Sequence, residues 1–200
     1  PYEMKGIMKD HVLSMIAEKF DAPTIIHKTV LTMGMGESWL SERIAAWEDG
    51  LTQEIKLAYL PSPGRVRLRL SAYGNNQIAL QSKLDVEVSN LVKLIPELVF
   101  GYDVDTIENV VGDLLRENGE TVGTAESCTG GLIAHKLTSI SGSSDYFLGS
   151  VVSYANEVKV NSLGVSESDL AEFGAVSEQV VRQMAEGARK VLHTSYAIAT

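Results

Sequence analysis

Residues 121–131, with the sequence TVGTAESCTGG, decide the fold of the second half of the chain. Thr121–Ala125 has the apolar composition of a buried strand, and Gly130–Thr138 has the pattern of a helix. Further strands, at Phe147–Tyr154 and from Tyr196 onward, alternate with helical segments. Strands that alternate with helices predict a layered α/β fold with a parallel sheet.

The helices of this half carry signals for their ends. Asp103–Asn118 is predicted to be a helix with an acidic first turn and Gly119 at its C-terminal cap position. Ser166–Asp169 has the pattern of a capping box before a short helix. Ser177 is expected to cap a long helix over 178–192.

The first half predicts a small α+β module of order β-α-β-β-α after an initial helix. Arg65–Tyr73 alternates apolar and basic residues, so one face of that strand should be buried and the other should be a basic face, either solvated or used for docking. Phe100–Tyr102 then links to the second half. The other expected segments are a helix over 3–20 that ends at Asp21-Ala22-Pro23, a strand Thr24–Met33, a helix Glu37–Trp47, a strand Ile55–Leu60, a turn Pro61–Gly64 and a helix over 77–95.

The composition is that of an ordinary soluble globular protein. The chain has 200 residues, of which 44% are hydrophobic and 22% charged, so one or two domains are expected. It contains no apolar run long enough to cross a bilayer and no signal-peptide pattern at its start. Cys128 is the single cysteine and has no partner for an internal disulfide. A cytoplasmic location without membrane contact is the simplest interpretation.

The net charge of −9 is concentrated in the second half. Residues 1–101 hold 11 basic and 12 acidic residues, a net of −1, whereas residues 102–200 hold 6 and 14, a net of −8. This acidity argues against binding of nucleic acid through its phosphates. Gly34–Glu37 also fits a plain turn better than a nucleic-acid loop, because Glu37 is acidic and no basic residue flanks it.

Ser127 is the first candidate for chemistry, because it lies where a strand gives way to a helix. A serine there could attack a substrate while the amides of the helix's first turn hold an oxyanion. The alternative is a plain helix cap, which serine also favours. His135 is eight residues away, about 12 Å along a helix, and is too far to act as its base. The carboxylates are scattered and no zinc-type spacing occurs, so no metal is expected.

Lys159 is a better candidate for the base. It follows the strand Phe147–Tyr154, and residues that follow adjacent parallel strands meet at the carboxyl edge of the sheet. Tyr154 and Asn156 belong to the same loop. A partly buried lysine can lose enough basicity to accept a serine proton near neutral pH. The alternative is a surface lysine on a short helix.

At this point the sequence resembles a known family, the competence/damage-inducible protein CinA. The resemblance covers essentially the whole chain, and the order of its motifs is highly specific. The motifs are Pro1–Lys5, which resembles the end of the family's molybdopterin-binding-like domain; Gly34–Ser38, Tyr59–Gly64 and Val66–Leu70, which resemble its KH-like linker domain; and Thr124–Gly131, Ser153–Lys159 and Gly174–Ser177, which resemble its C-terminal amidase domain.

The resemblance implies hydrolysis of nicotinamide mononucleotide to nicotinic acid mononucleotide and ammonia, as in NAD salvage. Ser127 matches the catalytic serine, Lys159 its lysine partner and Tyr154 a tyrosine of the same site. Backbone amides after Ser127 are expected to hold the oxyanion, and Glu126 and Thr129 to orient the pair. No metal or cofactor is implied, and the expected partner is a small nucleotide substrate. The expected substrate-binding residues are Glu126, Cys128, Thr129, Gly130, Gly131 and Asn156.

The implied domains are the tail of the molybdopterin-binding-like domain over 1–22, a KH-like linker domain over 23–101 and a partial amidase domain over 102–200. We expect the chain to belong to a longer protein, since the family has a Gly-rich segment and an arginine beyond Thr200. Ser195 stands where the family has an acidic residue. A homo-oligomer is expected because the linker domain is small. The rival hypothesis is a non-catalytic protein that binds a nucleotide or docks a partner.

Overall fold

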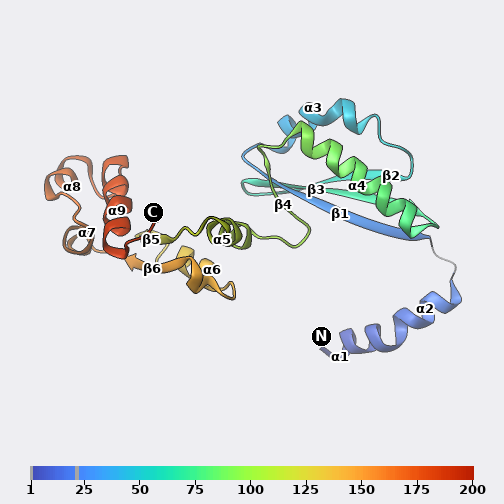
Figure 1. The fold of residues 1–200 in the computed structure, drawn as a ribbon, viewed down its shortest axis with the longest axis horizontal. Coiled ribbons are helices and arrows are strands. Elements are labelled where there is room, and N and C mark those ends of the chain that lie inside the picture. The colour runs from blue at the N-terminus through green and yellow to red at the C-terminus, as the bar shows by residue number, and fades with distance from the viewer. Residues whose placement is uncertain (1, 21–22) are drawn as a thin grey trace. The chain divides into compact units, whose positions relative to one another are not determined.

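Two separate sheets organise the chain, one in each half. In the computed structural model, residues 2–20 and 23–200 are described, except for the side chain of Ala17. The chain divides into unit 1, Pro1–Val104, and unit 2, Asp105–Thr200. Each unit has its own sheet and its own buried apolar residues, so each is described by itself (Figure 1).

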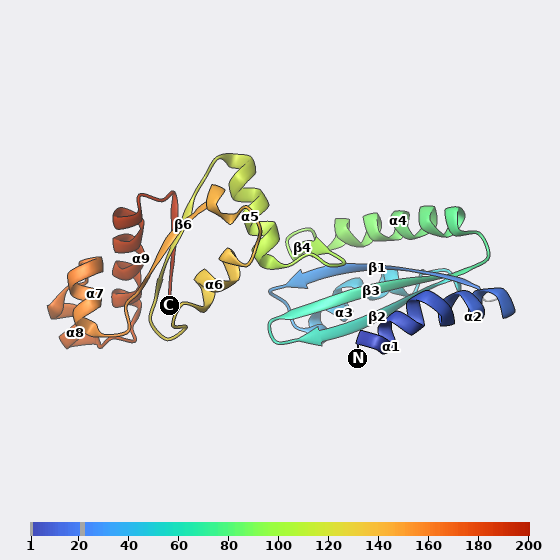
Figure 2. The same ribbon diagram turned by 90° about the horizontal axis from the view of Figure 1, so that it is seen from below.

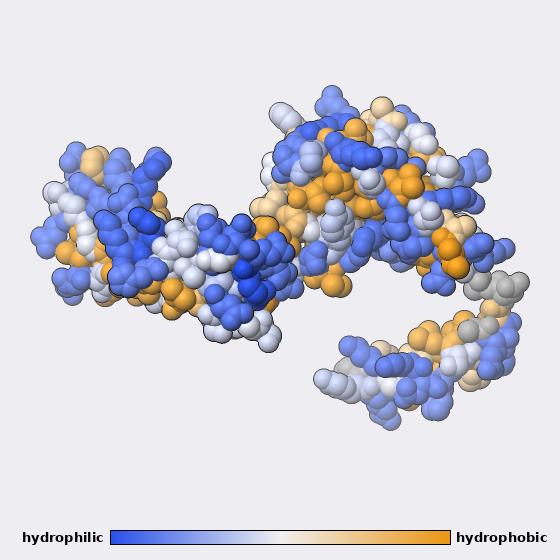
Figure 3. Space-filling model, in the orientation of Figure 1, coloured by the Kyte–Doolittle hydropathy of each residue, from blue (hydrophilic) through white to orange (hydrophobic). Residues whose placement is uncertain are grey.

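Unit 1 begins with a helical segment whose apolar side chains lie at its surface. The segment consists of α1 (Tyr2–Ile7), a π-helical turn η1 (Met8–Val12) and α2 (Leu13–Lys19). The predicted stop at Asp21-Ala22 lies outside the described residues. Ile7 and Phe20, the residue that follows α2, are both exposed. Figure 3 shows hydrophobic residues, in orange, on the surface of this segment. Among the helices of residues 2–20 and 23–200, none is long and apolar enough to cross a membrane.

A four-stranded antiparallel sheet forms the centre of unit 1. The elements are β1 (Thr24–Met33), α3 (Glu37–Glu48), β2 (Ile55–Ser62), β3 (Arg65–Gly74), α4 (Gln77–Leu94) and β4 (Val99–Tyr102). The strand order is β2-β3-β1-β4. Both helices lie on one side of this sheet, where Leu40, Leu68 and Leu84 belong to the same buried cluster (Figure 1).

The alternation predicted for β3 is confirmed. Val66, Leu68 and Leu70 are buried, whereas Arg65, Arg67 and Arg69 are exposed. Successive residues of a strand point to opposite faces, so the apolar residues contact the helices and the arginines face away from them. A docking role for this basic face stays a prediction.

Two expectations for unit 1 were wrong in detail. Phe100–Tyr102 is not a link, because it belongs to β4, which pairs with the edge of β1. The turn predicted over Pro61–Gly64 is shorter, because β2 continues to Ser62 and its last residues pair with β3. A proline is tolerated in β2 because β2 is an edge strand, where one side of the backbone needs no partner.

Unit 2 is built on a three-stranded parallel sheet in the order β6-β5-β7. Its elements are α5 (Ile107–Asn118), β5 (Val122–Glu126), α6 (Leu132–Thr138), a 3₁₀ turn η2 (Ser143–Asp145), β6 (Phe147–Val152), α7 (Asn156–Leu163), α8 (Glu167–Phe173), α9 (Glu178–Leu192) and β7 (Tyr196–Ala199).

Helices cover both faces of this sheet, which confirms the predicted layered α/β fold and gives it three layers, α/β/α. On one face, Ala125 of β5 packs with Val180 and Met184 of α9. On the other, Val122 of β5 packs with Leu137 of α6 and with α5. Figure 2 shows α9 and α6 on opposite sides of the strands.

The helix ends in unit 2 follow the predicted caps, with one exception. Ser166 and Ser177 each accept a hydrogen bond from the amide three residues later, and Gly119 ends α5 in the left-handed conformation. The exception is the start of α5. Thr106 caps that helix, so Asp103 lies before it, and the Asp103 carboxylate instead accepts hydrogen bonds from Lys28 and the amide of Thr29 within unit 1.

Gly187 lets α9 approach the end of α7 closely. A Cβ added at this position would lie 2.0 Å from the carbonyl oxygen of Leu163, which is a backbone atom and cannot rotate away. Gly187 is buried, and α7 carries Lys159. The contact therefore sets how near α7 lies to the helix that covers the sheet.

We predict that Gly187→Ala lowers the free energy of unfolding by about 1–3 kcal/mol, because the added methyl group forces the two helices apart. Urea unfolding measures the change. Glu186→Ala is the control, because Glu186 is exposed on the same helix and its replacement should change stability by no more than about 0.5 kcal/mol. An equal or greater stability of Gly187→Ala would contradict the close approach, since alanine is otherwise the better helix former.

Candidate active site

The carboxyl ends of the three strands meet at one edge of the sheet in unit 2. Ser127 follows β5, Ser153 follows β6 and Thr200 follows β7. The amide of Ser127 donates to the carbonyl of Thr200 at 2.8 Å, and the amide of Ser153 donates to the carbonyl of Glu126 at 2.8 Å. Backbone hydrogen bonds therefore fix the positions of the three strand ends relative to one another.

Lys159 lies beneath this edge with its amine directed at Ser127. The Lys159 Nζ is 3.0 Å from Ser127 Oγ, 2.7 Å from the carbonyl oxygen of Ser153 and 3.3 Å from that of Tyr154. Its side chain is buried, with 2% exposure. None of the ion pairs formed within the described ranges includes Lys159. Lys159 is therefore not the surface lysine of the alternative interpretation.

Ser127 does not cap the following helix. The N-cap position of α6 is Gly131, which is in the left-handed conformation and supplies no side-chain cap. The Ser127 hydroxyl instead contacts the Lys159 amine. Its side chain is only partly buried, so the oxygen of this Ser–Lys pair can be reached from outside the protein.

Glu126 takes the place of a helix cap. Its carboxylate is fully buried and accepts five hydrogen bonds, from the hydroxyls of Thr124 and Thr129 and from three amides at the start of α6. Burial raises the pKa of this carboxyl, but the hydrogen bonds outweigh that effect and hold the pKa below its ordinary value. Glu126 therefore fixes the loop that carries Ser127.

The network excludes one expected source of oxyanion donors, the first turn of α6. The amides of Gly131, Ile133 and Ala134 already donate to Glu126, so the first turn of α6 is not free to hold an oxyanion. Among the described residues, the amides of Cys128 and Thr129 have no hydrogen-bond acceptor. These two amides directly follow Ser127 and are the available donors.

A hollow of about 450 Å³ opens beside Ser127. We call it the Ser127 hollow, and the residues that line it are Ser127, Cys128, Ala175, Val176, Ser177, Glu178, Val181, Met184 and Thr200. Most of its wall comes from the start of α9 and the segment before that helix. Apolar side chains with a few hydroxyl groups are typical of a small-molecule site of this size.

The other residues expected in the site lie around it in different ways. The Tyr154 side chain is 78% exposed, and only its carbonyl contacts Lys159. Asn156 is exposed and lines a separate hollow between α7 and α8. Gly130 and Gly131 form the left-handed turn before α6. Of the expected substrate-binding residues, Cys128 lines the Ser127 hollow.

Thr200 and the segment before α9 were not among the expected site residues. Thr200 follows a parallel strand, so the rule that brought Ser127 and Lys159 together also predicts its position. Ala175–Ser177 belongs to a motif of the family resemblance, although no contact was assigned to it. Glu178, Val181 and Met184 lie on one face of α9, and no signal in the sequence directs that face to the site.

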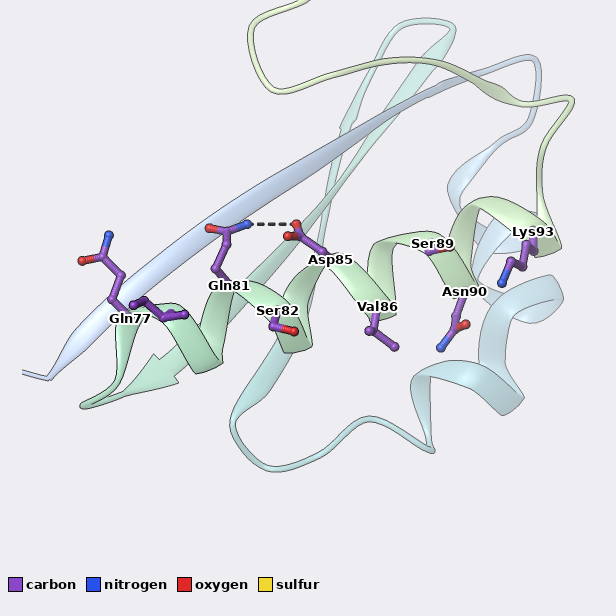
Figure 4. Close-up of a pocket in the computed structure, with 9 residues that line it drawn as sticks. Gln77, Gln81, Ser82, Asp85, Val86, Ser89, Asn90 and Lys93 are labelled. Carbon is purple, nitrogen blue, oxygen red and sulfur yellow. Dashed lines mark hydrogen bonds between the residues drawn. The ribbon is translucent and has the colours of Figure 1, made fainter.

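A larger hollow of about 780 Å³ lies along α4 in unit 1 and does not compete with this site. Figure 4 shows Gln81 and Asp85 pointing toward one another, and their side chains form a hydrogen bond of 2.9 Å. Its lining has no nucleophile paired with a base. Within residues 2–20 and 23–200, no group of three or more His, Cys, Asp or Glu side chains could hold a metal ion.

Two family models match the chain in the order of its two units. Residues 27–101 match the damage-inducible protein CinA KH domain, and residues 104–200 match the CinA C-terminal domain. The chain therefore belongs to the CinA family. Its fold is a KH-like α+β domain followed by a CinA C-terminal α/β domain.

Curated relatives support this membership. A CinA-like protein from Flavobacterium psychrophilum is 52% identical over 201 residues, which cover 100% of this chain and 48% of that protein. A CinA-like protein from Cytophaga hutchinsonii is 44% identical, over 99% of this chain and 47% of that protein. The chain thus spans about half the length of these relatives. Among solved structures, the chain is similar to the crystal structure of competence/damage inducible protein CihA from Agrobacterium tumefaciens, with a TM-score of 0.44. The two sequences are 42% identical over 46% of this chain and 56% of that one.

We predict that Glu126→Gln destabilises unit 2 by about 1–3 kcal/mol at neutral pH. The NH₂ group of glutamine cannot accept the hydrogen bonds that one carboxylate oxygen accepts, and its hydrogens would point at the groups that donate to Glu126. The folded-state pKa of Glu126 is lowered, so its carboxylate contributes stability above the ordinary value of 4.5, and this contribution is lost as the pH falls through the lowered pKa. The difference from wild type should therefore shrink below about pH 4.5. Thermal unfolding from pH 7 to pH 3 measures it.

Glu117→Gln is the matched control, because Glu117 is exposed on α5. Its replacement should change the unfolding temperature little at any pH in this range. Equal stability of Glu126→Gln and wild type at pH 7 would contradict the role of this carboxylate in fixing the loop.

Proposed function

We propose that unit 2 is an amidase that hydrolyses the carboxamide of nicotinamide mononucleotide to nicotinic acid mononucleotide and ammonia. The observation that supports the chemistry is the 3.0 Å separation of Lys159 Nζ and Ser127 Oγ beside an open hollow. A nucleophile within hydrogen-bond reach of a base is the signature of covalent catalysis. The choice of substrate rests on the motifs shared with the CinA family.

The first half of the proposed reaction forms an acyl-enzyme. The lone pair of the Lys159 amine takes the Ser127 hydroxyl proton while Oγ attacks the carboxamide carbon. The carbonyl oxygen becomes an oxyanion and accepts hydrogen bonds from the amides of Cys128 and Thr129. The C–N bond then breaks, the proton on Lys159 passes to the nitrogen, and ammonia leaves.

The second half releases the acid. A water molecule gives a proton to Lys159 and attacks the ester carbon of the acyl-enzyme. The bond to Ser127 Oγ breaks, and the proton on Lys159 returns to that oxygen. The sum of both halves consumes one water and yields the carboxylic acid and ammonia, and neither half calls for a metal ion or a cofactor.

The size and lining of the Ser127 hollow support binding of the nicotinamide ring of the proposed substrate. Its volume of about 450 Å³ lies within the range of about 300–1,000 Å³ for small-molecule sites. Ala175, Val176, Val181 and Met184 offer apolar surface for a planar ring. Glu126 is buried and lies outside the lining, so we assign it to positioning the loop and not to substrate contact.

We predict that Ser127→Ala in the full-length protein abolishes ammonia release from nicotinamide mononucleotide, because no other hydroxyl of the described residues contacts Lys159. Lys159→Met should lower kcat by about 10²–10⁴-fold, the usual contribution of a general base. Because the two residues act as a unit, the double variant should be hardly slower than Ser127→Ala alone. A coupled ammonia assay measures the rates.

Lys136→Met is the matched control, since Lys136 is exposed on α6 and pairs with Glu108 at the surface. Its rate should equal that of the wild type. Wild-type rates of ammonia release by Ser127→Ala would contradict the proposal. Wild-type protein that binds the nucleotide and releases no ammonia would favour the rival, a non-catalytic nucleotide-binding protein.

A further inference from the structure

A chain of two hydroxyl groups connects the buried Glu126 to the wall of the Ser127 hollow. Thr129 Oγ1 lies 2.7 Å from Glu126 Oε2 and 2.7 Å from Thr200 Oγ1. Thr200 lines the hollow together with Ser127 and Cys128. The carboxylate is thus linked to the surface that a ligand would touch.

The carboxylate fixes the direction of both hydrogen bonds. Although burial raises the pKa of Glu126, its five donors hold it below the ordinary value, so the group is ionised at neutral pH and only accepts. Thr129 must therefore donate its single hydroxyl proton to Glu126. The Thr129 oxygen can then only accept a hydrogen bond from Thr200, because Thr129 has no second proton to donate to it. Without a proton from Thr200, none would lie between two oxygens 2.7 Å apart.

This direction decides what Thr200 offers to the hollow. Its one hydroxyl proton is committed to Thr129, and no hydrogen bond within the described residues uses its remaining lone pairs. A ligand in the hollow that reaches Thr200 Oγ1 therefore meets an oxygen that accepts hydrogen bonds and does not donate one.

We propose that Thr200 selects amides, by accepting a hydrogen bond from the substrate NH₂ group that an ester or a carboxylate cannot supply. The inference rests on the proposed amidase function and names the chemical group that the site distinguishes. An amide nitrogen carries two hydrogens, whereas an ester oxygen and a carboxylate carry none. A site that holds an unpaired polar group rejects the analogue that lacks its partner.

The same contact favours release of the product. Hydrolysis replaces the NH₂ group by a carboxylate oxygen, which then faces the lone pairs of Thr200. Two acceptors in contact repel, so the acid should bind more weakly than the amide. The departing ammonia still has hydrogens to donate and keeps the contact until it leaves.

The test compares two substrates that form the same acyl-enzyme, nicotinamide mononucleotide and the methyl ester of nicotinic acid mononucleotide. The measured quantity is the ratio of their kcat/KM values in the full-length protein. Thr200→Val, which removes the hydroxyl, should lower the amide-to-ester ratio by about tenfold, the size of one hydrogen bond. Thr200→Ser, which keeps the hydroxyl, should retain the wild-type ratio. Unfolded molecules hydrolyse neither substrate, so a loss of folded protein cancels in the ratio.

Thr129→Val tests the direction of the chain. It removes the acceptor of the Thr200 proton, so Thr200 can turn and donate to the acid product. The inhibition constant for nicotinic acid mononucleotide should then fall by about tenfold. Thr200→Val should not produce this tenfold fall, because valine has no hydroxyl group to donate to the product.

The outcomes separate the two proposals. If the wild type hydrolyses both substrates but Thr200→Val leaves the ratio unchanged, the amidase proposal stands and the role of Thr200 is refuted. If Thr200→Val lowers both rates equally, its role is structural and the inference is again refuted. If the wild type hydrolyses neither substrate, the amidase proposal fails, and the inference fails with it.

Discussion

The buried carboxylate of Glu126 is the interaction on which the site depends. It gathers five donors from β5, the loop after β5 and the start of α6, and no side chain caps α6 in its place. An uncompensated carboxylate in this position would be costly, so the loop must adopt the one path that brings these donors to it. That path directs the Ser127 hydroxyl toward Lys159. Within the described residues, it leaves the amides of Cys128 and Thr129 without acceptors.

Backbone contacts carry this local order to the rest of unit 2. The amide of Ser127 is held by Thr200, and that of Ser153 is held by Glu126, so the ends of β7 and β6 are tied to the same loop. The carbonyl of Ser153 in turn accepts from the Lys159 amine. The proposed nucleophile, base and substrate-selecting hydroxyl are therefore positioned mainly by backbone groups of a parallel sheet, which move little once the strands have paired.

General geometry, in which residues after parallel strands meet at one edge, made Lys159 a candidate partner of Ser127, and the family resemblance singled out that pair. Periodicity likewise predicted β3, with its arginines on one face. An orienting role for Glu126 was expected, but the hydrogen bonds by which it holds the loop could not be foreseen, since its donors are up to eight residues away and depend on how the loop turns. The outward direction of Tyr154 and the pairing of β4 with β1 depend on three-dimensional packing in the same way.

The tie between Thr129 and Thr200 joins residues that lie 71 positions apart along the chain. A ribosome adding about 5–20 residues per second needs roughly 4–14 s to cover that interval. During that time the serine loop has emerged without the strand end that anchors it, and the buried carboxylate lacks the outer part of its network. The hydrogen bonds that tie the Ser127 loop to Thr200 can therefore form only late in the synthesis of this unit, after β7 has joined the sheet.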